Sequence, residues 1–234
     1  MNTPTKPVAL IVGASRGLGL AMAVEYASRG WLVIATARGE ANTPLHDLAR
    51  DSYGRVEVET LDITNRDQIL SLRQHLSERH IDLLFVNAGV ATRDTEVSAL
   101  DVSDAEFIQV MTTNVLAPLR VLEAFESLVP NTGTLGVMSS GLGSVADNEH
   151  GGWSIYRSSK AALNQLMRSF AAARAGDPRA MLLICPGWVR TDMGGSDADL
   201  SIDESIPCVV DTITNATGTP GLRYLDYRGH TVHW

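Results

Sequence analysis

The sequence predicts an α/β fold: one doubly wound domain whose parallel sheet of about seven strands carries helices on both faces. Three observations predict it. Short apolar segments rich in β-branched residues alternate with longer helical patterns along the whole chain, as a parallel sheet with helical crossovers requires. The 234 residues suffice for one such domain with a sizeable core. No repeat, linker or low-complexity stretch divides them, so we expect a single domain over residues 1–234.

The expected strands are short and bounded by turn residues. In chain order they are Val8–Val12, Trp31–Thr36, Val56–Thr60, Ile81–Val86, Thr134–Ser139, Ala180–Cys185 and Leu222–Asp226. Most are continuous apolar runs, which are typical of strands that a parallel sheet buries on both faces.

The expected helices show apolar residues at intervals of three and four. They are Gly17–Arg29, a helix through Ile69, Leu72 and Leu76, then Ser103–Leu128, Trp153–Ala175 and Ser201–Ala216. Thr64 with Asp67, and Ser103 with Glu106, have the spacing of capping boxes that would start two of these helices. Pro207 lies inside the last helix, where we expect a kink.

Composition and charge exclude several classes of function. Lys and Arg number 19 against 27 Asp and Glu, a formal charge of −8, so neither nucleic acid nor an anionic membrane is an expected partner. No apolar run approaches the ~20 residues of a membrane-spanning helix. Cys185 and Cys208 are the only cysteines, and they form neither a disulfide framework nor a CxxC pair. With no secretory signal at the start, we expect a cytoplasmic protein that acts on a small molecule and holds no metal.

A glycine-rich turn joins the first strand to the first helix. Gly13, Gly17 and Gly19 have the spacing GxxxGxG, and a strand–turn–helix context is typical of a dinucleotide site. We expect Gly13 to allow the tight turn, Gly17 to let the backbone approach a pyrophosphate, and Gly19 to allow close helix packing. Backbone N–H groups around Ser15 and Leu18 would attract the phosphates. A purely structural turn is the alternative interpretation.

The end of the second strand indicates which dinucleotide would bind. An acidic residue there binds the ribose 2′-hydroxyl of NAD, whereas the 2′-phosphate of NADP requires a cation. Here Arg38 follows the strand, no acid occurs before Glu40, and Arg16 adds a second cation from the glycine turn. Because guanidinium groups bind phosphate oxygens at two points, the sequence favours NADP(H). Two solvated arginines are the alternative.

A phenol and an ammonium group are expected on one face of a helix. Tyr156 and Lys160 are four residues apart, a spacing that makes them neighbours on a helix. An ammonium beside a phenol favours the phenolate, so we expect Lys160, together with an oxidised nicotinamide, to lower the pKa of Tyr156 from its usual value of about 10 toward neutrality. The pair would then be suited to general acid–base work. YxxxK is a weak motif on its own.

Further motifs follow the same chain order. After the glycine turn come Asn87-Ala88-Gly89, Asn114, Ser139-Ser140, the YxxxK pair and Pro186-Gly187. Together these motifs resemble the short-chain dehydrogenase/reductase family over essentially the whole chain. The run from Pro186 to Gly195 and the ending Leu225-Asp226-Tyr227 are most similar to the sniffer-type carbonyl reductases and C-signal-like proteins. The resemblance implies a Rossmann-type fold and NADPH-dependent reduction of an aldehyde, ketone or quinone.

The resemblance also implies roles for individual residues. Tyr156 would protonate the substrate oxygen and Ser140 would bind it, although Ser139 stays open as an alternative. Lys160 would tune Tyr156 and contact the nicotinamide ribose, and Asn114 would hold a water in a proton relay. Other cofactor-binding residues implied in this way are Asp62, Ile63, Asn87, Ala88, Gly89, Pro186, Gly187, Val189 and Thr191. A helix-capping role for Asp62 and an ordinary turn at Pro186-Gly187 are the alternatives.

Leu142, Trp153, Trp188 and Met193 could wall an apolar substrate pocket, with packing as the alternative. The segment between Met193 and Pro207 would form a flap over it.

By resemblance, the two long helices would form a homodimer or homotetramer interface. A nicotinamide-nucleotide-binding signalling protein with little turnover is the main alternative function. An epimerase of sugar nucleotides is disfavoured, because the chain ends soon after the seventh strand.

Overall fold

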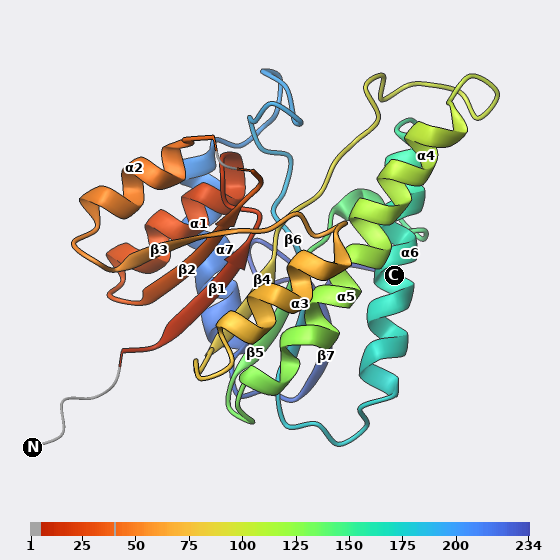
Figure 1. Ribbon diagram of the computed structural model, residues 1–234. Helices are drawn as coiled ribbons and strands as arrows, with labels where there is room; N and C mark the ends of the chain where they lie inside the picture. Colours follow the sequence, from red (N-terminus) through yellow and green to blue (C-terminus); the bar gives the residue numbers. More distant parts are fainter. Residues whose placement is uncertain (1–5, 40) are drawn as a thin grey trace, which may run out of the picture.

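Seven parallel strands form one sheet between two layers of helices in the computed structural model (Figure 1), which describes residues 6–39 and 41–234. Glu40 lies outside the described residues. The strands are β1 (Val8–Val12), β2 (Leu32–Ala37), β3 (Val56–Thr60), β4 (Leu83–Val86), β5 (Thr134–Met138), β6 (Ala180–Cys185) and β7 (Gly221–Asp226). They lie in the order β3-β2-β1-β4-β5-β6-β7. The predicted doubly wound α/β domain is confirmed.

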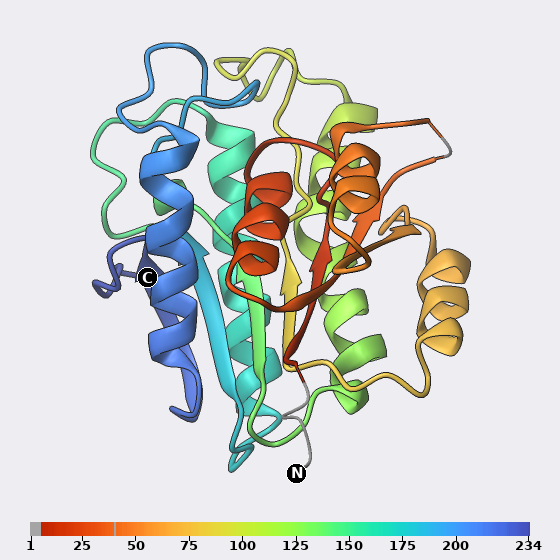
Figure 2. The same ribbon diagram turned by 90° about the vertical axis from the view of Figure 1, so that its left-hand side faces the viewer.

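The helices divide between the two faces of the sheet (Figures 1 and 2). One face carries α1 (Gly17–Ser28), α2 (Pro44–Asp51) and α7 (Ile202–Ala216), and the other carries α3 (Arg66–His75), α5 (Ala117–Phe125) and α6 (Ser154–Ala172). Side chains of each strand alternate between two cores: Leu10 and Val12 pack toward α3, α5 and α6, whereas Ala9 and Ile11 pack toward α1 and α7. Burial on both faces explains the continuous apolar strand sequences.

The helix termini differ from the prediction in identifiable ways. The side chain of Asn65, not Thr64, caps α3 by accepting hydrogen bonds from the N–H groups of two residues in its first turn. Ser103 caps α4 (Asp104–Met111), but the Glu106 carboxylate accepts the N–H of Arg93 instead of completing the box. The helix α7 is continuous through Pro207.

Helix α2 has no counterpart in the sequence prediction. Thr43 at the N-cap and Pro44 in the first turn are its start signals. Its eight residues bury only Leu45, so the apolar periodicity that identifies a helix is too short to be recognised.

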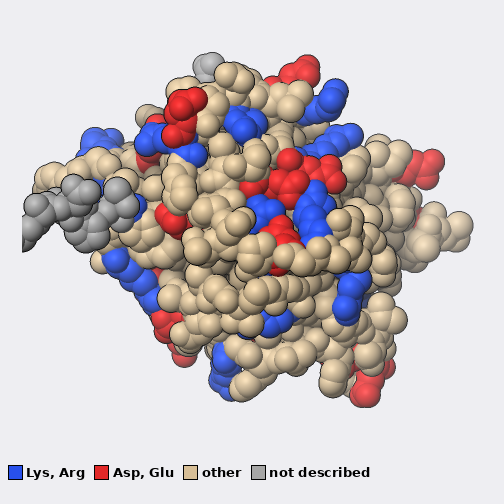
Figure 3. Space-filling view, turned by 90° about the horizontal axis from the view of Figure 1, so that it is seen from below, with Lys and Arg blue, Asp and Glu red and all other residues tan. Residues whose placement is uncertain are grey.

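An ion-pair cluster closes the end of the sheet where the strands begin. Glu126, in the short helix η2 (Glu126–Leu128), accepts two hydrogen bonds from the Arg174 guanidinium at 2.6 and 2.7 Å, and its backbone carbonyl accepts one from Arg179. Figure 3, a view of this end, shows acidic and basic side chains side by side. The carboxylate is only 23% exposed, so the pair is worth more than a surface salt bridge.

We expect Glu126→Ala to lower the free energy of unfolding by about 1–2 kcal/mol, because it leaves the half-buried Arg174 guanidinium without its carboxylate, while Arg179 keeps its ion pair with Asp177. Thermal denaturation would show a Tm about 3–6 °C lower. The exposed pair of Arg50 with Asp47 provides the control, since Asp47→Ala should leave Tm unchanged. Equal shifts in the two variants would contradict the assignment.

Candidate active site

A single crevice of about 1370 Å³ lies at the edge of the sheet where the strands end. The chain runs from β1 outward to β2 and β3, then returns to β4 on the other side of β1. At such a reversal the loops after adjacent strands diverge and leave room for a ligand. The crevice is lined by the glycine turn, the end of β2 and the loops after β3, β4, β5 and β6.

The glycine turn has the geometry that its spacing predicts. Gly13 has a φ of +88°, and a Cβ added to it would lie 2.7 Å from the Cβ of Ala88. Gly17 has a φ of +58° and faces open space, so its backbone is accessible from the crevice. A Cβ on Gly19 would lie 2.1 Å from the carbonyl oxygen of Gly13. Because the first N–H groups of a helix have no intrahelical acceptor, α1 directs free donors into the crevice near Leu18.

Polar contacts hold the turn in place. Thr36 at the end of β2 is buried and its hydroxyl accepts the N–H of Gly13 at 3.0 Å. The Asn87 amide donates to the carbonyl of Gly13 at 2.8 Å, so the motif after β4 supports the turn besides lining the crevice with Ala88 and Gly89. Side chains at the ends of the two strands that flank β1 thus fix the glycine backbone.

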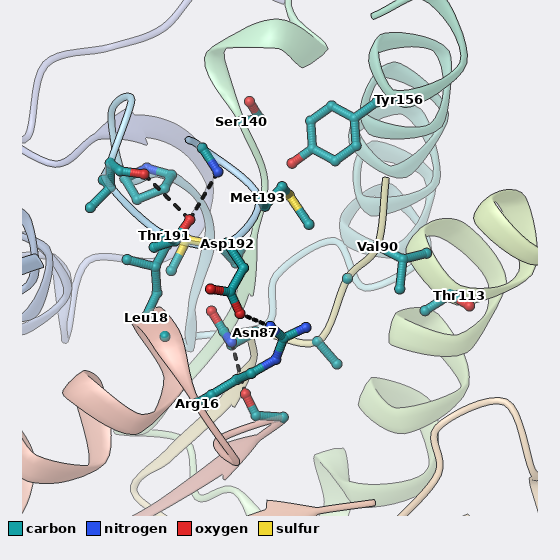
Figure 4. A pocket seen from close by; sticks show the side chains of 18 of the residues that line it. Arg16, Leu18, Asn87, Val90, Thr113, Ser140, Tyr156, Thr191, Asp192 and Met193 are labelled. Atoms are coloured by element: carbon teal, nitrogen blue, oxygen red, sulfur yellow. Dashed lines mark hydrogen bonds and ion pairs between the residues drawn. The ribbon is translucent and has the colours of Figure 1, made fainter. Parts of the chain in front are cut away.

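The end of the crevice beside β2 and β3 contains the predicted cations. Arg16 and Arg38 both line it and are exposed, and Arg16 forms an ion pair with Asp192 from the loop after β6 (Figure 4). Asp62 also lines this end, with Ile63 beside it. The Asp62 carboxylate accepts two hydrogen bonds from Thr64, at 2.7 and 2.8 Å, and it does not cap α3.

The other end brings together the side chains of Ser140, Tyr156 and Lys160. Figure 4 shows Ser140 and Tyr156 directed into the same part of the crevice, from the end of β5 and from α6. The Lys160 ammonium lies 5.7 Å from the centre of the Tyr156 ring and donates to the carbonyl of Met138 at 2.9 Å. Ser139 points elsewhere: its buried hydroxyl donates to Asn164 at 2.7 Å.

Burial controls the protonation of this cluster in the chain alone. It raises the pKa of Tyr156 to about 12, and a hydrogen bond with Ser140 opposes the rise. It also lowers the pKa of Lys160 to about 8. Each charged form loses its hydration inside the protein, so a phenolate and an ammonium are both disfavoured. The predicted lowering of the Tyr156 pKa is therefore wrong as far as it rests on Lys160 alone, because desolvation is the largest effect and raises this pKa. The combined effect of Lys160 and an oxidised nicotinamide stays a prediction.

Asn114 lies in a distorted part of its helix. The predicted helix Ser103–Leu128 is divided into α4, a π-helical turn η1 (Thr112–Leu116), α5 and η2. Such turns are frequent at functional sites. Asn114 is fully buried, and its amide oxygen accepts the N–H of Val90 while its nitrogen donates to Ser159 at 2.9 Å. It thereby connects the loop after β4 to the helix that carries Tyr156 and Lys160.

Apolar side chains surround the open end. Leu142, Trp153, Trp188 and Met193 all line the crevice. Trp153 precedes α6 with a φ of +51°, and its ring packs edge-on against Tyr156 at 5.7 Å between centroids. Trp188 is held by a hydrogen bond from its indole N–H to the carbonyl of Gly194. The loop Pro186–Thr191 connects them to the glycine-turn side, with Pro186, Gly187, Val189 and Thr191 lining the crevice.

Sequence reasoning missed several residues on this side. Val90, Gln109, Thr113 and Arg157 also line the crevice, and Figure 4 shows Val90 and Thr113 at its wall. They come from a loop and from two helices whose relative placement depends on the tertiary fold. The sequence contains one faint signal, the spacing of Gln109 and Thr113 on one helix face.

Two further observations bear on metal binding and on membrane insertion. Glu57, Glu59 and His75 bring potential metal-ligand atoms within 4.8 Å of one another on the outer surface of β3 and α3, apart from the crevice lining. Among residues 6–39 and 41–234, no helix combines the length and hydropathy needed to cross a membrane.

A doubly wound sheet with a glycine turn and a Ser, Tyr and Lys cluster defines a dinucleotide-dependent oxidoreductase. The chain belongs to the short chain dehydrogenase family, whose model matches residues 7–200. A short-chain dehydrogenase/reductase from Burkholderia multivorans with bound NADP is 55% identical, with a TM-score of 0.97 over 98% of this chain and 100% of its own.

Two further relatives bear on activity. A carbonyl reductase from Pseudomonas aeruginosa PAO1 in complex with NADP is 37% identical, with a TM-score of 0.91 over 98% of this chain and 100% of its own. The C-signal protein of Myxococcus xanthus is 36% identical over 66% of this chain and 93% of its own length. The resemblance to the family, and within it to sniffer-type carbonyl reductases and C-signal, is confirmed.

Proposed function

We propose that the protein reduces an aldehyde, ketone or quinone to the alcohol, with NADPH as the reductant. One observation carries the proposal: the hydroxyl groups of Ser140 and Tyr156 face the same space at one end of a dinucleotide-sized crevice, with the Lys160 ammonium behind them. Relatives with bound NADP, one of them a carbonyl reductase, support the choice of cofactor and reaction.

The residues present fit this cofactor. The open backbone at Gly17 and the free N–H groups of α1 suit a pyrophosphate, and Arg16 and Arg38 suit a 2′-phosphate. Asp62, Ile63, Asn87, Ala88 and Gly89 would surround the adenosine, and the loop Pro186–Thr191 would hold the nicotinamide. The bound cofactor supplies the hydride.

The chain itself binds the carbonyl and moves the proton. Ser140 donates a hydrogen bond to the carbonyl oxygen, where negative charge develops during reduction. Tyr156 donates its phenolic proton to the same oxygen as the alcohol forms. Burial raises the pKa of Tyr156, which keeps that proton in place until the reaction draws it off. The apolar side chains around this end lower the local polarity, which strengthens both hydrogen bonds.

Lys160 and Asn114 return the proton to Tyr156. A pKa of about 8 lets Lys160 exchange protons near neutral pH. The cofactor ribose would contact its ammonium, which now donates to the Met138 carbonyl. Asn114 is buried beside the loop after β4 and would hold the water that links Lys160 to solvent.

Oxidation of NADPH, followed by its absorbance at 340 nm with a panel of aldehydes, diketones and quinones, tests the proposal. Turnover that requires a carbonyl compound supports it. If the protein binds NADPH in a fluorescence titration but no carbonyl compound is reduced, the signalling alternative, to which the C-signal relative lends weight, replaces it.

Arg38 is expected to select NADPH over NADH. Arg38→Asp removes a cation at the 2′-phosphate position and introduces a repelling charge, so the ratio of kcat/KM for NADPH to that for NADH should fall about 10- to 100-fold. Steady-state kinetics with both cofactors measure the ratio. Arg50→Asp has the same charge change on α2, outside the crevice lining, and should leave the ratio unchanged. An unchanged ratio in Arg38→Asp would exclude Arg38 from the phosphate site.

We also propose a cytoplasmic location, in keeping with two free cysteines, and association into a homodimer or homotetramer through α4 and α6. Phe107, Ile108 and Leu166 on these helices are large apolar side chains exposed to solvent.

A further inference from the structure

Tyr224 in β7 is a buried tyrosine that the proposed chemistry does not use. Its residue is 1% exposed and packs in the core between the sheet and α6. Its hydroxyl donates a short hydrogen bond to the backbone carbonyl of Ser140, 84 residues away in the chain. A polar group is buried at a cost unless it is bonded, and here the bond reaches the residue that would bind the substrate oxygen.

The Ser140 segment is held at several points. Ser139 before it donates its N–H to Ile184 at 2.8 Å, and Gly141 after it donates its N–H to the sulfur of Cys185 at 2.9 Å. These two bonds fix the backbone on the β6 side. The carbonyl of Ser140 itself accepts the N–H of Gly143 at 2.8 Å and the Tyr224 hydroxyl. The Tyr224 hydroxyl therefore binds the Ser140 carbonyl from the side of the sheet that faces α6.

The segment Val232–Trp234 in turn covers Tyr224. Val232 donates its N–H to the Tyr224 carbonyl at 2.9 Å, and the Trp234 ring packs against the Tyr224 ring at 5.5 Å between centroids. On α6, the guanidinium of Arg168 lies over the Trp234 ring, 4.1 Å from its centroid. The arrangement leaves the Tyr224 ring enclosed by β7, α6 and this segment, so its hydroxyl has little freedom to move.

The same segment is tied to the loop that follows Ser140. The Trp234 carbonyl accepts the N–H of Ala146 at 3.1 Å, and the His233 imidazole lies 2.8 Å from the Asp147 carboxylate. This loop runs from Ser140 to Tyr156. The end of the chain therefore contacts both Tyr224 and the connection between the two proposed catalytic residues.

We infer that Tyr224, clamped by Trp234, is a positioning residue that holds Ser140 in the orientation needed to bind the substrate oxygen. The inference rests on the proposed function of Ser140. Catalytic groups lose activity steeply when they move, by about 100-fold for a displacement of 1 Å. The Ser140 hydroxyl itself accepts the N–H of Leu142 at 3.2 Å, and the hydrogen bond from Tyr224 helps to fix the peptide group from which this side chain extends. Loss of the Tyr224 hydroxyl leaves the ring packing intact but removes one of the three hydrogen bonds that hold this peptide group, so that its position becomes less well defined.

Tyr224→Phe tests the inference. We expect kcat for a carbonyl substrate to fall about 5- to 20-fold, while KM for NADPH and its dissociation constant from fluorescence titration stay within twofold. Because the hydrogen bond with Ser140 lowers the pKa of Tyr156, the pH profile of kcat should also shift to higher pH. A change in folding alone would alter Tm and the cofactor constants without moving the profile.

A double-mutant cycle separates this inference from the proposed function. Tyr224→Phe should have no further effect on kcat in a Ser140→Ala background, because its effect passes through the serine hydroxyl. If Ser140→Ala alone leaves kcat unchanged, the proposed function fails. The positioning role of Tyr224 fails if Ser140→Ala lowers kcat but Tyr224→Phe does not. It also fails if the effects of the two substitutions on kcat multiply in the double variant. In both cases the proposed carbonyl reduction still stands.

Tyr26 provides the matched control. It is equally buried, between α1 and α7, and its hydroxyl has no partner among the described residues. Tyr26→Phe should leave kcat and the pH profile unchanged. Trp234→Ala should reproduce the effect of Tyr224→Phe at about 2- to 5-fold, and an unchanged kcat in that variant would exclude the clamp.

Discussion

Replacement of Tyr156 by Phe is expected to lower kcat for carbonyl reduction by about 10³-fold or more. The substitution removes one hydroxyl group and keeps the ring that packs against Trp153. Its phenolic proton would be the one delivered to the substrate oxygen, and a positioned general acid contributes about 10²–10⁴-fold. Steady-state oxidation of NADPH at 340 nm with the best carbonyl substrate measures the loss.

Cofactor binding should survive this substitution. We expect the dissociation constant of NADPH, measured by fluorescence titration, to stay within threefold, because most of the crevice that would hold the dinucleotide is formed by other residues. Tyr26→Phe removes a hydroxyl from a buried tyrosine away from the crevice and should retain full activity. A Tyr156→Phe protein with more than a tenth of the original kcat would show that another group supplies the proton.

The fold was predictable because its signals are local. Continuous apolar strands, a glycine turn and helices with apolar stripes each lie within 5 to 25 residues, and their alternation restricts the topology to a doubly wound sheet. The glycine geometry followed from spacing alone, since Gly13 and Gly17 have the positive φ angles and Gly19 the close contact that their positions require. Helix α2 was missed because eight residues with one buried side chain give no periodicity.

Long-range contacts in the site were not predictable from sequence patterns. Thr36 supports Gly13 from 23 residues away, and Tyr224 reaches Ser140 across 84 residues. Neither residue type is unusual for a strand, so no local pattern distinguishes them. The π-helical turn around Asn114 is likewise a tertiary effect. The pKa of Tyr156 has a related explanation: helical spacing identifies Lys160 as a neighbour, but the burial that raises this pKa depends on the whole fold.

Lys160→Met is expected to separate activity from stability. Loss of the Lys160 ammonium should lower kcat by about 10²-fold or more, because this group would both contact the cofactor ribose and return the proton to Tyr156. The same ammonium is 3% exposed and donates one hydrogen bond, to the carbonyl of Met138. A buried charge with one neutral partner destabilises the folded state. The variant should therefore be at least as stable as the original protein at pH 7, by urea denaturation.

The difference in the free energy of unfolding between the original protein and Lys160→Met should depend on pH, and the sign of this dependence follows from the pKa of Lys160. The pKa of Lys160 is about 8 in the folded protein, against 10.5 for an ordinary lysine. Below pH 8 both states carry the proton, and the folded protein bears the full cost of the buried charge. As pH rises from 8 to 10.5, the folded state releases the proton while the unfolded state keeps it, so the unfolded state binds more protons and stability increases. Above 10.5 the two states are again alike.

Comparison of the two proteins at two pH values isolates this effect. Between pH 7 and pH 9.5, the free energy of unfolding of the original protein should rise by about 2 kcal/mol relative to that of Lys160→Met. Lys6, the chain's only other lysine, is exposed, so Lys6→Met should follow the original protein at both pH values. A constant difference between the original protein and Lys160→Met would mean that Lys160 keeps an ordinary pKa. It would then be charged throughout this pH range and could not exchange protons with Tyr156 near neutrality.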